Sequence, residues 1–210
     1  MQADATPTPR RGRPRAFDRT AALAQATRLF WEKGFEATSM ADLTAAMGIG
    51  SPSLYAAFGS KEALYGEALG HYRDTYETLV WSGFFAQDDV RAAFACWLHD
   101  SAAALTGCVA DIPRGCMVTL SAVGSEGHAE LGELVRAARA ITLARLEARL
   151  QRAVEEQQIS GAVDVHGVAR FMQTVQGGMS IVARDGAHRA ELEAVAQLAM
   201  MGFDARIKTG

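Results

Sequence analysis

The chain has 210 residues, of which 49% are hydrophobic, and a formal net charge of −3. This length and composition can bury a sizeable core without metal or disulfide support, and three cysteines do not form the paired pattern of a disulfide framework. No apolar run approaches the length of a membrane span, and the N-terminus is polar rather than signal-like. The sequence therefore predicts a cytoplasmic protein with no membrane partner.

The charge is unevenly distributed along the chain. Residues 1–60 carry a balance of +2 and residues 61–210 a balance of −5. Five arginines fall within ten positions near the N-terminus: Arg10, Arg11, Arg13, Arg15 and Arg19. A short basic segment on an otherwise acidic protein indicates local contact with a polyanion.

The first predicted elements are short. Residues 1–16 have the prolines and arginines of a flexible arm and no apolar periodicity. Asp18 can cap a helix that ends at Gly34, and Thr38 or Ser39 can cap a second helix that stops at Gly48. A third helix should run from Ser51-Pro52 to Gly59, and a fourth from Ser60 towards Trp81.

The rest of the chain contains one proline, Pro113, and no sustained period-two alternation. Helices are therefore predicted over residues 88–106, 115–124, 127–157, 164–184 and 188–207. The fold class is all-α. The two short helices joined at residues 47–50 have the length and turn chemistry of a helix-turn-helix, although spacing alone also fits an ordinary pair of core helices.

Residues 30–64, FWEKGFEATSMADLTAAMGIGSPSLYAAFGSKEAL, resemble the DNA-binding domain of the tetracycline-repressor (TetR) family. The resemblance rests on the aromatic residues around Gly34, Thr38-Ser39, Leu54-Tyr55 with Phe58, and Ser60-Lys61-Glu62. A weaker resemblance covers residues 114–122 and 176–192.

The resemblance implies three parts: a basic arm (1–16), a helix-turn-helix domain (17–62) and a ligand-binding and dimerisation domain (63–210). It also implies a homodimer that is released from double-stranded operator DNA by a small molecule. Such a regulator is not an enzyme, and the sequence contains no recognisable catalytic constellation or cofactor motif.

The resemblance also assigns candidate DNA contacts. Thr38, Tyr55 and Lys61 match positions that hold phosphates, with Ser39 beside them, and Ser51 and Ser53 match positions that face base edges. Pro52 offers apolar contact, for example to a thymine methyl. Ala56 and Ala57 replace side chains that are often polar or aromatic, so the groove-facing surface is sparse.

The arm could supplement this sparse surface. Arg11, Arg13 and Arg15 lie in an RGRPR sequence that matches the core of an AT-hook, in which arginines lie in a narrow minor groove. The same segment also fits a generic basic tail that raises affinity without base preference.

The C-terminal part predicts a dimer interface and a cavity. Apolar stripes on the last two helices favour a homodimer through these helices. A cavity among the preceding helices should take a largely apolar effector, although each candidate could equally be plain packing. The candidate wall residues are Tyr72, Tyr76, Phe94, Trp97, Cys116, Met117, Phe171, Met172 and Val175.

Two alternatives involve cysteine. Cys96 and His99 are three residues apart on a predicted helix and could bind a metal ion, and Cys116, beside Arg114, could react with oxidants or electrophiles. The simpler interpretation is that these cysteines are small buried residues, with no metal bound. Two further alternatives are a helical small-molecule-binding protein that does not bind DNA, and an architectural DNA-binding protein without an inducer.

Overall fold

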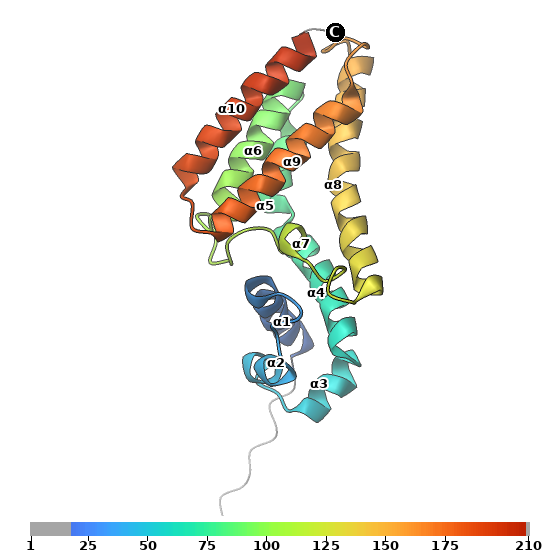
Figure 1. Cartoon of the computed structure of the whole chain (residues 1–210), viewed down its shortest axis with the longest axis vertical. Coiled ribbons are helices and arrows are strands. Elements are labelled where there is room, and N and C mark those ends of the chain that lie inside the picture. Colours follow the sequence, from blue (N-terminus) through green and yellow to red (C-terminus); the bar gives the residue numbers. More distant parts are fainter. Residues whose placement is uncertain (1–17, 209–210) are drawn as a thin grey trace, which may run out of the picture.

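The computed structural model describes residues 18–208, and in this range every regular element is a helix (Figure 1). The all-α prediction is therefore confirmed. The predicted arm contacts Arg11, Arg13 and Arg15 lie outside the described residues. The helices are α1 (Arg19–Lys33), α2 (Met40–Met47), α3 (Ser51–Phe58), α4 (Lys61–Tyr76), α5 (Thr78–Ala86), α6 (Val90–Leu105), α7 (Met117–Leu120), α8 (Ala129–Glu155), α9 (Val165–Arg184) and α10 (Arg189–Lys208).

Side-chain caps fix where the first helices begin. The Asp18 carboxylate accepts a hydrogen bond from the backbone N–H of Ala21 at 3.0 Å. Ser39, rather than Thr38, caps α2, and it forms a reciprocal capping box with Asp42. Gly48 ends α2 with a φ of +66°, a left-handed conformation that glycine adopts without strain. These local signals place α1 and α2 where the sequence predicts them, and α3 begins after Gly50 with Pro52 in its first turn.

The helix-turn-helix shares its core with the elements that follow it. Phe30, Leu43, Leu54 and Phe58 are buried together with residues from α4, including Leu64. The same core continues into residues of α7, the following loop and the start of α8: Met117, Val123, Leu131 and Val135. The predicted boundary between residues 62 and 63 falls within the first turn of α4, a helix that packs back on α1.

A second core lies at the opposite end of the molecule, among α5, α6, α8, α9 and α10 (Figure 1). Its largest fully buried side chains include Trp97, Phe94, Leu146 and Phe203. Gly83 allows α5 to lie close against α6, because a Cβ there would overlap Cys96 and Asp100. Within residues 18–208, no helix is long and apolar enough to cross a membrane.

The predicted helix from Ser60 towards Trp81 is in fact two helices. The chain turns at Glu77, which ends α4 and begins α5. Tyr72 and Tyr76 on α4 pack against Trp31, whereas Trp81 on α5 packs against Trp97 in the second core. The two helices pack into different cores, and this packing overrides the continuous helical pattern of the sequence.

The predicted helix over residues 115–124 is shortened to the four residues of α7. Gly115 has a φ of +78° and precedes the helix as a turn residue. At the other end, the Arg139 guanidinium donates to the carbonyl groups of Val118, Thr119 and Ser121 at 2.7–3.2 Å. An arginine from α8 therefore satisfies carbonyl groups that a longer helix would pair internally.

Candidate DNA-binding face and effector cavity

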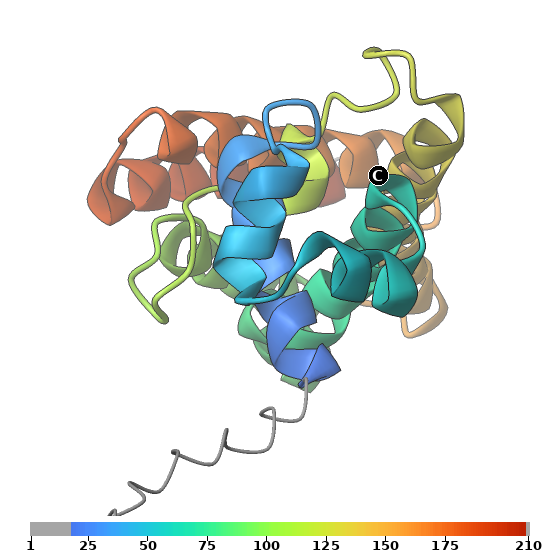
Figure 2. The ribbon, with the colours of Figure 1, turned by 90° about the horizontal axis from the view of Figure 1, so that it is seen from below.

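α2 and α3 form one end of the molecule, and Figure 2 views that end directly. The start of α3 exposes Ser51, Pro52 and Ser53, whereas Leu54 is buried against the first core. Tyr55 leaves 51% of its surface exposed. The predicted base-reading residues and one predicted phosphate contact therefore share an open surface.

The other predicted phosphate contacts differ in accessibility. The Lys61 ammonium lies 4.2 Å from the centre of the Phe35 ring, a cation–π contact at the start of α4. Ser39 is exposed, although its hydroxyl also serves the capping box. Thr38 is fully buried, and its hydroxyl donates to the Gly34 carbonyl at 2.6 Å. In this conformation the Thr38 side chain is committed to the turn and does not face outward.

Arg19 is a neighbour of α3 that the motif did not single out. Its guanidinium donates to the Ala57 carbonyl at 3.3 Å and to Glu67 at 2.7 Å, and it lies 4.5 Å from the Phe58 ring centre. These contacts fix the first described residues of α1 beside the end of α3.

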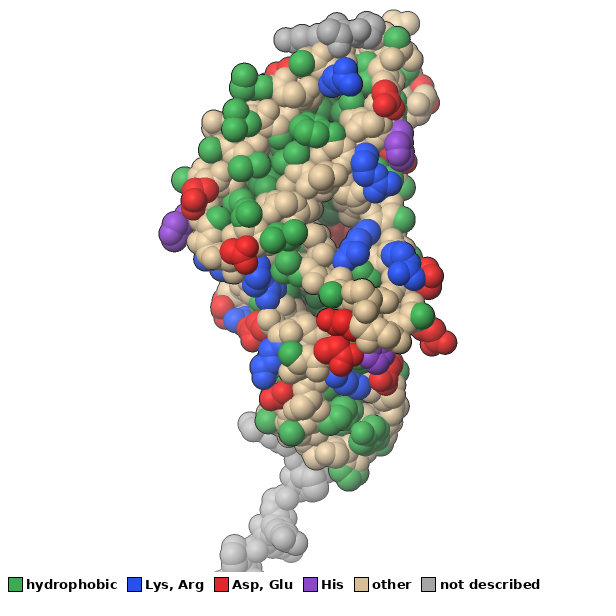
Figure 3. All heavy atoms as spheres, viewed as in Figure 1, with side chains coloured by type: hydrophobic (Ala, Val, Ile, Leu, Met, Phe, Trp, Pro, Cys, Tyr) green, Lys and Arg blue, Asp and Glu red, His purple; other side chains and the backbone are tan. Residues whose placement is uncertain are grey.

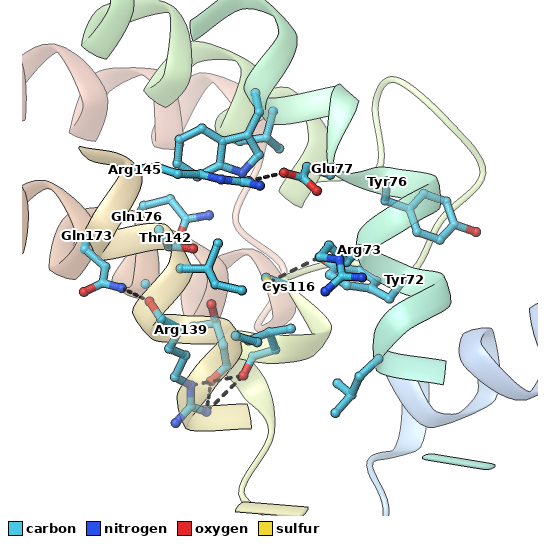
Figure 4. Close-up of a pocket in the computed structure, with 18 of the residues that line it drawn as sticks. Tyr72, Arg73, Tyr76, Glu77, Cys116, Arg139, Thr142, Arg145, Gln173 and Gln176 are labelled. Atoms are coloured by element: carbon cyan, nitrogen blue, oxygen red, sulfur yellow. Dashed lines mark hydrogen bonds and ion pairs between the residues drawn. The ribbon is translucent and has the colours of Figure 1, made fainter. Parts of the chain in front are cut away.

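A cavity of about 760 Å³ lies between α4–α6 on one side and α8–α9 on the other (Figure 4). The α4–α6 side is mainly aromatic and aliphatic, with Leu69, Tyr72, Tyr76, Val80, Trp81 and Trp97. The opposite side adds polar side chains: Thr119, Arg139, Thr142, Arg145, Gln173 and Gln176. This volume suits a small organic molecule.

Comparison with known proteins identifies the family. Residues 22–68 match the family model described as "Bacterial regulatory proteins, tetR family". The chain is 36% identical over 197 residues to the HTH-type transcriptional repressor ComR of Escherichia coli K12, covering 90% of this chain and 89% of ComR. It belongs to the TetR family of transcriptional regulators.

Two further relatives support this assignment. The HTH-type transcriptional repressor BdcR of Escherichia coli K12 is 33% identical over 192 residues, with 90% of each chain covered. The TetR family regulator CifR, solved as a cysteine mutant in complex with 26-bp double-strand operator DNA, is 36% identical, with a TM-score of 0.84 over 90% of this chain and 98% of that chain. This TetR-family protein is a DNA-binding transcriptional regulator.

Four predicted pocket residues of this regulator line the cavity: Tyr72, Tyr76, Trp97 and Cys116. The other five do not. Phe94 and Met172 are buried in the second core, and Val175 packs against that core. Met117 belongs to the first core, and Phe171 is exposed on α9. Helical periodicity places these apolar side chains on one face of a helix, but it does not show which neighbouring helix that face contacts.

Cys116 occupies the cavity wall just before α7. The Tyr72 hydroxyl lies 3.3 Å from its sulfur and donates to it, and the Cys116 backbone N–H donates to Ser180 Oγ at 2.8 Å. Burial raises the pKa of Tyr72 well above its usual range, so the phenol remains a neutral donor. Tyr72 from α4 therefore holds the Cys116 thiol, and the backbone of Cys116 is bonded to Ser180 on α9.

The polar residues of the cavity are the ones that sequence reasoning missed. Arg145 forms an ion pair with Glu77 that joins α8 to the α4–α5 turn, and its guanidinium lies 5.1 Å from the Trp81 ring centre (Figure 4). The Gln173 side chain donates to the Arg139 carbonyl at 2.8 Å. Spacings of three, as in Arg139, Thr142 and Arg145, could have indicated a polar inward face on α8.

The proposed pairing of Cys96 with His99 is not observed. The Cys96 thiol donates to Asp100 at 3.4 Å, whereas His99 lies near Arg189 and Glu193 on α10. Within residues 18–208, no three His, Cys, Asp or Glu side chains gather as a metal site. The two residues share a helix but have different partners.

The last two helices of the regulator each have a buried and an exposed apolar face. Met172, Met179, Leu192 and Phe203 lie in the core. Hydrophobic side chains also cover the outer surface of α9 and α10 (Figure 3). The exposed residues there are Phe171, Ile181, Val182, Val195, Leu198 and Met201, with Leu198 and Met201 each 68% exposed. Exposed apolar side chains gathered on two neighbouring helices are typical of a protein interface.

Proposed function

We propose that this regulator is a repressor that binds a palindromic operator as a homodimer and leaves it when a small molecule fills the cavity. The observation that carries the proposal is that Trp31, a residue of the DNA-binding domain, also lines the cavity. Trp31 belongs to α1 of the helix-turn-helix, lines the cavity, and donates its indole N–H to the Gly115 carbonyl at 2.9 Å. A molecule in the cavity would therefore touch the DNA-binding domain directly.

The start of α3 would enter the major groove. Ser51 and Ser53 would face base edges and Pro52 would give apolar contact, while Ser39, Tyr55 and Lys61 would hold phosphates. The arm residues Arg11, Arg13 and Arg15 would add contacts in the minor groove. Because few groove-facing side chains are polar, we expect DNA shape and the arm to supply part of the specificity.

The exposed apolar surface of α9 and α10 would form the dimer interface. Two recognition helices must lie about 34–36 Å apart to match one turn of DNA. An effector that favours a different separation would release the operator, because it stabilises the conformation in which it binds better. We place this activity in the cytoplasm, where an operator would be accessible.

Selection from randomised duplexes at physiological salt tests this function. We expect a palindrome with half-sites about one helical turn apart. Tyr55→Ala and Lys61→Ala should each weaken operator binding, and losing a phosphate contact should lower the salt slope by about one. Asp74→Ala, on the far part of α4, is the matched control. A selected pool without an enriched sequence would contradict the proposal.

A second candidate is a thiol-responsive version of the same switch. It is favoured by the position of Cys116, whose sulfur lies in the cavity wall within reach of the Tyr72 hydroxyl. Alkylation should release the operator from the unmodified protein. It should release the operator from Cys108→Ser as well, because Cys108 is an exposed cysteine outside the cavity. It should not release the operator from Cys116→Ser. Unchanged DNA binding after complete alkylation of Cys116 would exclude this version.

A further inference from the structure

The charge lining the cavity is opposite in sign to that of the whole chain. The described lining residues include five arginines, namely Arg73, Arg136, Arg139, Arg145 and Arg170, and one acidic residue, Glu77. The protein as a whole carries a net charge of −3. Arginine side chains gather along the α8 side of the molecule beside the recess between α8 and α9 (Figure 3).

Nearby carboxylates neutralise only part of this positive charge. Arg73 pairs with Asp74 and Arg136 with Glu133, both at the protein surface. Arg139 instead donates to backbone carbonyl groups, and Arg170 donates to the Gln173 amide at 2.9 Å. Within the described part of the chain, neither Arg139 nor Arg170 has a carboxylate partner. The cavity wall therefore has an excess of positive charge even after its ion pairs are counted.

Arg145 is the arginine best placed to receive an anion. Among residues 18–208, Glu77 is the carboxylate that pairs with it. Its guanidinium lies over the Trp81 and Phe85 rings, with distances of 5.1 and 5.8 Å to the ring centres. Stacking of this kind holds the planar group in one orientation, in which its donors can meet a carboxylate.

The opposite wall suits an apolar body. Leu69, Tyr76, Val80 and Trp97 line it. Trp97 is fully buried, and its indole N–H has no hydrogen-bond acceptor in the described structure.

We propose that the effector of this cavity is an organic acid, with one carboxylate directed at Arg145 and an aromatic or aliphatic body against the α4–α6 wall. This rests on the proposed function, since it names the chemical class of the molecule that the cavity takes. The exposed arginines at the surface, Arg73, Arg136 and Arg170, would attract the anion, and the half-buried Arg145 would bind it. An entering carboxylate would compete with Glu77 for Arg145 and so loosen the link between α8 and the α4–α5 turn.

Two variants test the sign of the charge. Glu77→Gln and Arg145→Gln break the same ion pair, but they change the cavity charge in opposite directions. The probes are 3-phenylpropanoate and octanoate, each compared with its amide and its amine, and binding to the full chain is measured by calorimetry. We expect the acids to bind the unmodified protein at least about tenfold more tightly than the amides or amines.

The two variants should then differ in their affinity for the acids. Glu77→Gln should bind the acids several-fold more tightly than the unmodified protein, and Arg145→Gln should bind them about tenfold more weakly. The proposal would be overturned if the amines bound more tightly than the acids, if acid and amide bound equally, or if neither acid bound. It would also be overturned if both variants bound the acids with the same affinity. Operator binding is measured in the same samples without probe. Its absence would count against the proposed function, whereas intact operator binding without acid binding would count against this inference alone.

Discussion

The Arg184 guanidinium donates from Nη2 to the backbone carbonyl of Trp31 at 2.7 Å. The same side chain donates to the Glu32 carbonyl at 2.8 Å and to the Arg114 carbonyl at 2.8 Å. The last residue of α9 thus caps the last turn of α1, whose carbonyl groups have no partner within the helix. α9 carries part of the proposed dimer surface, and α1 belongs to the DNA-binding domain; the end of α9 lies next to α1 in Figure 1. The Arg184 hydrogen bonds therefore tie the orientation of α1 to that of α9.

Removal of this contact should weaken both stability and DNA binding. Arg184→Met should lower the free energy of unfolding by about 2–3 kcal/mol, because a charged donor is lost from three carbonyl groups. Operator affinity should also fall, since α1 is no longer fixed to α9. Urea unfolding and operator titration measure the two effects. Arg152→Met, which breaks an exposed ion pair on α8, is the control and should change little. A normal operator affinity for Arg184→Met would show that α9 does not position α1.

The hydrogen bond from Trp31 to Gly115 should hold the segment before α7 in place. Trp31→Phe removes the indole N–H, leaves a buried carbonyl without its donor, and should cost about 1–2 kcal/mol of stability. Amide hydrogen exchange in the segment of Gly115 and Cys116 should become faster. Trp81→Phe, on the other side of the cavity, should leave exchange there unchanged. Equal exchange in Trp31→Phe and the unmodified protein would mean that this bond does not restrain the segment.

The capping box of α2 should make stability depend on pH in the acid range. The pKa of Asp42 is lowered to about 2, mainly because the Ser39 backbone N–H donates to the carboxylate, with Lys33 also 3.2 Å away. A folded pKa below the unfolded value of about 3.9 means that this stabilisation is complete above that value and is lost as the pH falls through about 2.

Asp42→Ala should therefore be less stable than the unmodified protein at pH 7, and the difference should shrink between about pH 4 and pH 2. Urea unfolding of the two proteins side by side measures it, because acid effects on other carboxylates are common to both. A stability difference that stays constant down to pH 2 would assign the loss to interactions of the side chain that do not depend on the Asp42 charge.

The exposed apolar surface of α9 and α10 should be required for association. Leu198→Lys places a charge on a residue that is 68% exposed, so it should not disturb the core of the protomer. We expect sedimentation to show a monomer and operator affinity to fall by about tenfold or more, since one half-site then binds alone. Val109→Lys, on the exposed loop before α7, should remain dimeric. A dimeric Leu198→Lys would place the interface elsewhere.

The sequence by itself determined the helices that have local start and stop signals. Asp18, Ser39 and Ser60 each accept a backbone N–H of the helix that they begin, and Gly48 ends α2 in a left-handed conformation. Such caps involve residues within a few positions of one another, so they can be recognised in a single chain. The outward-facing residues at the start of α3 were expected from the family resemblance rather than from a cap, since α3 begins after Gly50 without a side-chain cap.

Tertiary structure alone decided the division between α4 and α5, the shortening of α7 and the polar wall of the cavity. Each depends on a partner that is distant in sequence: Trp81 packs on Trp97, Arg139 binds the carbonyl groups around α7, and Arg145 pairs with Glu77. Helical periodicity shows that a side chain lies on one face of a helix, but burial and ion pairing depend on which other helix covers that face. The packing of α8 against α4 and α9 therefore settled what the sequence left open: which side chains meet in the cavity.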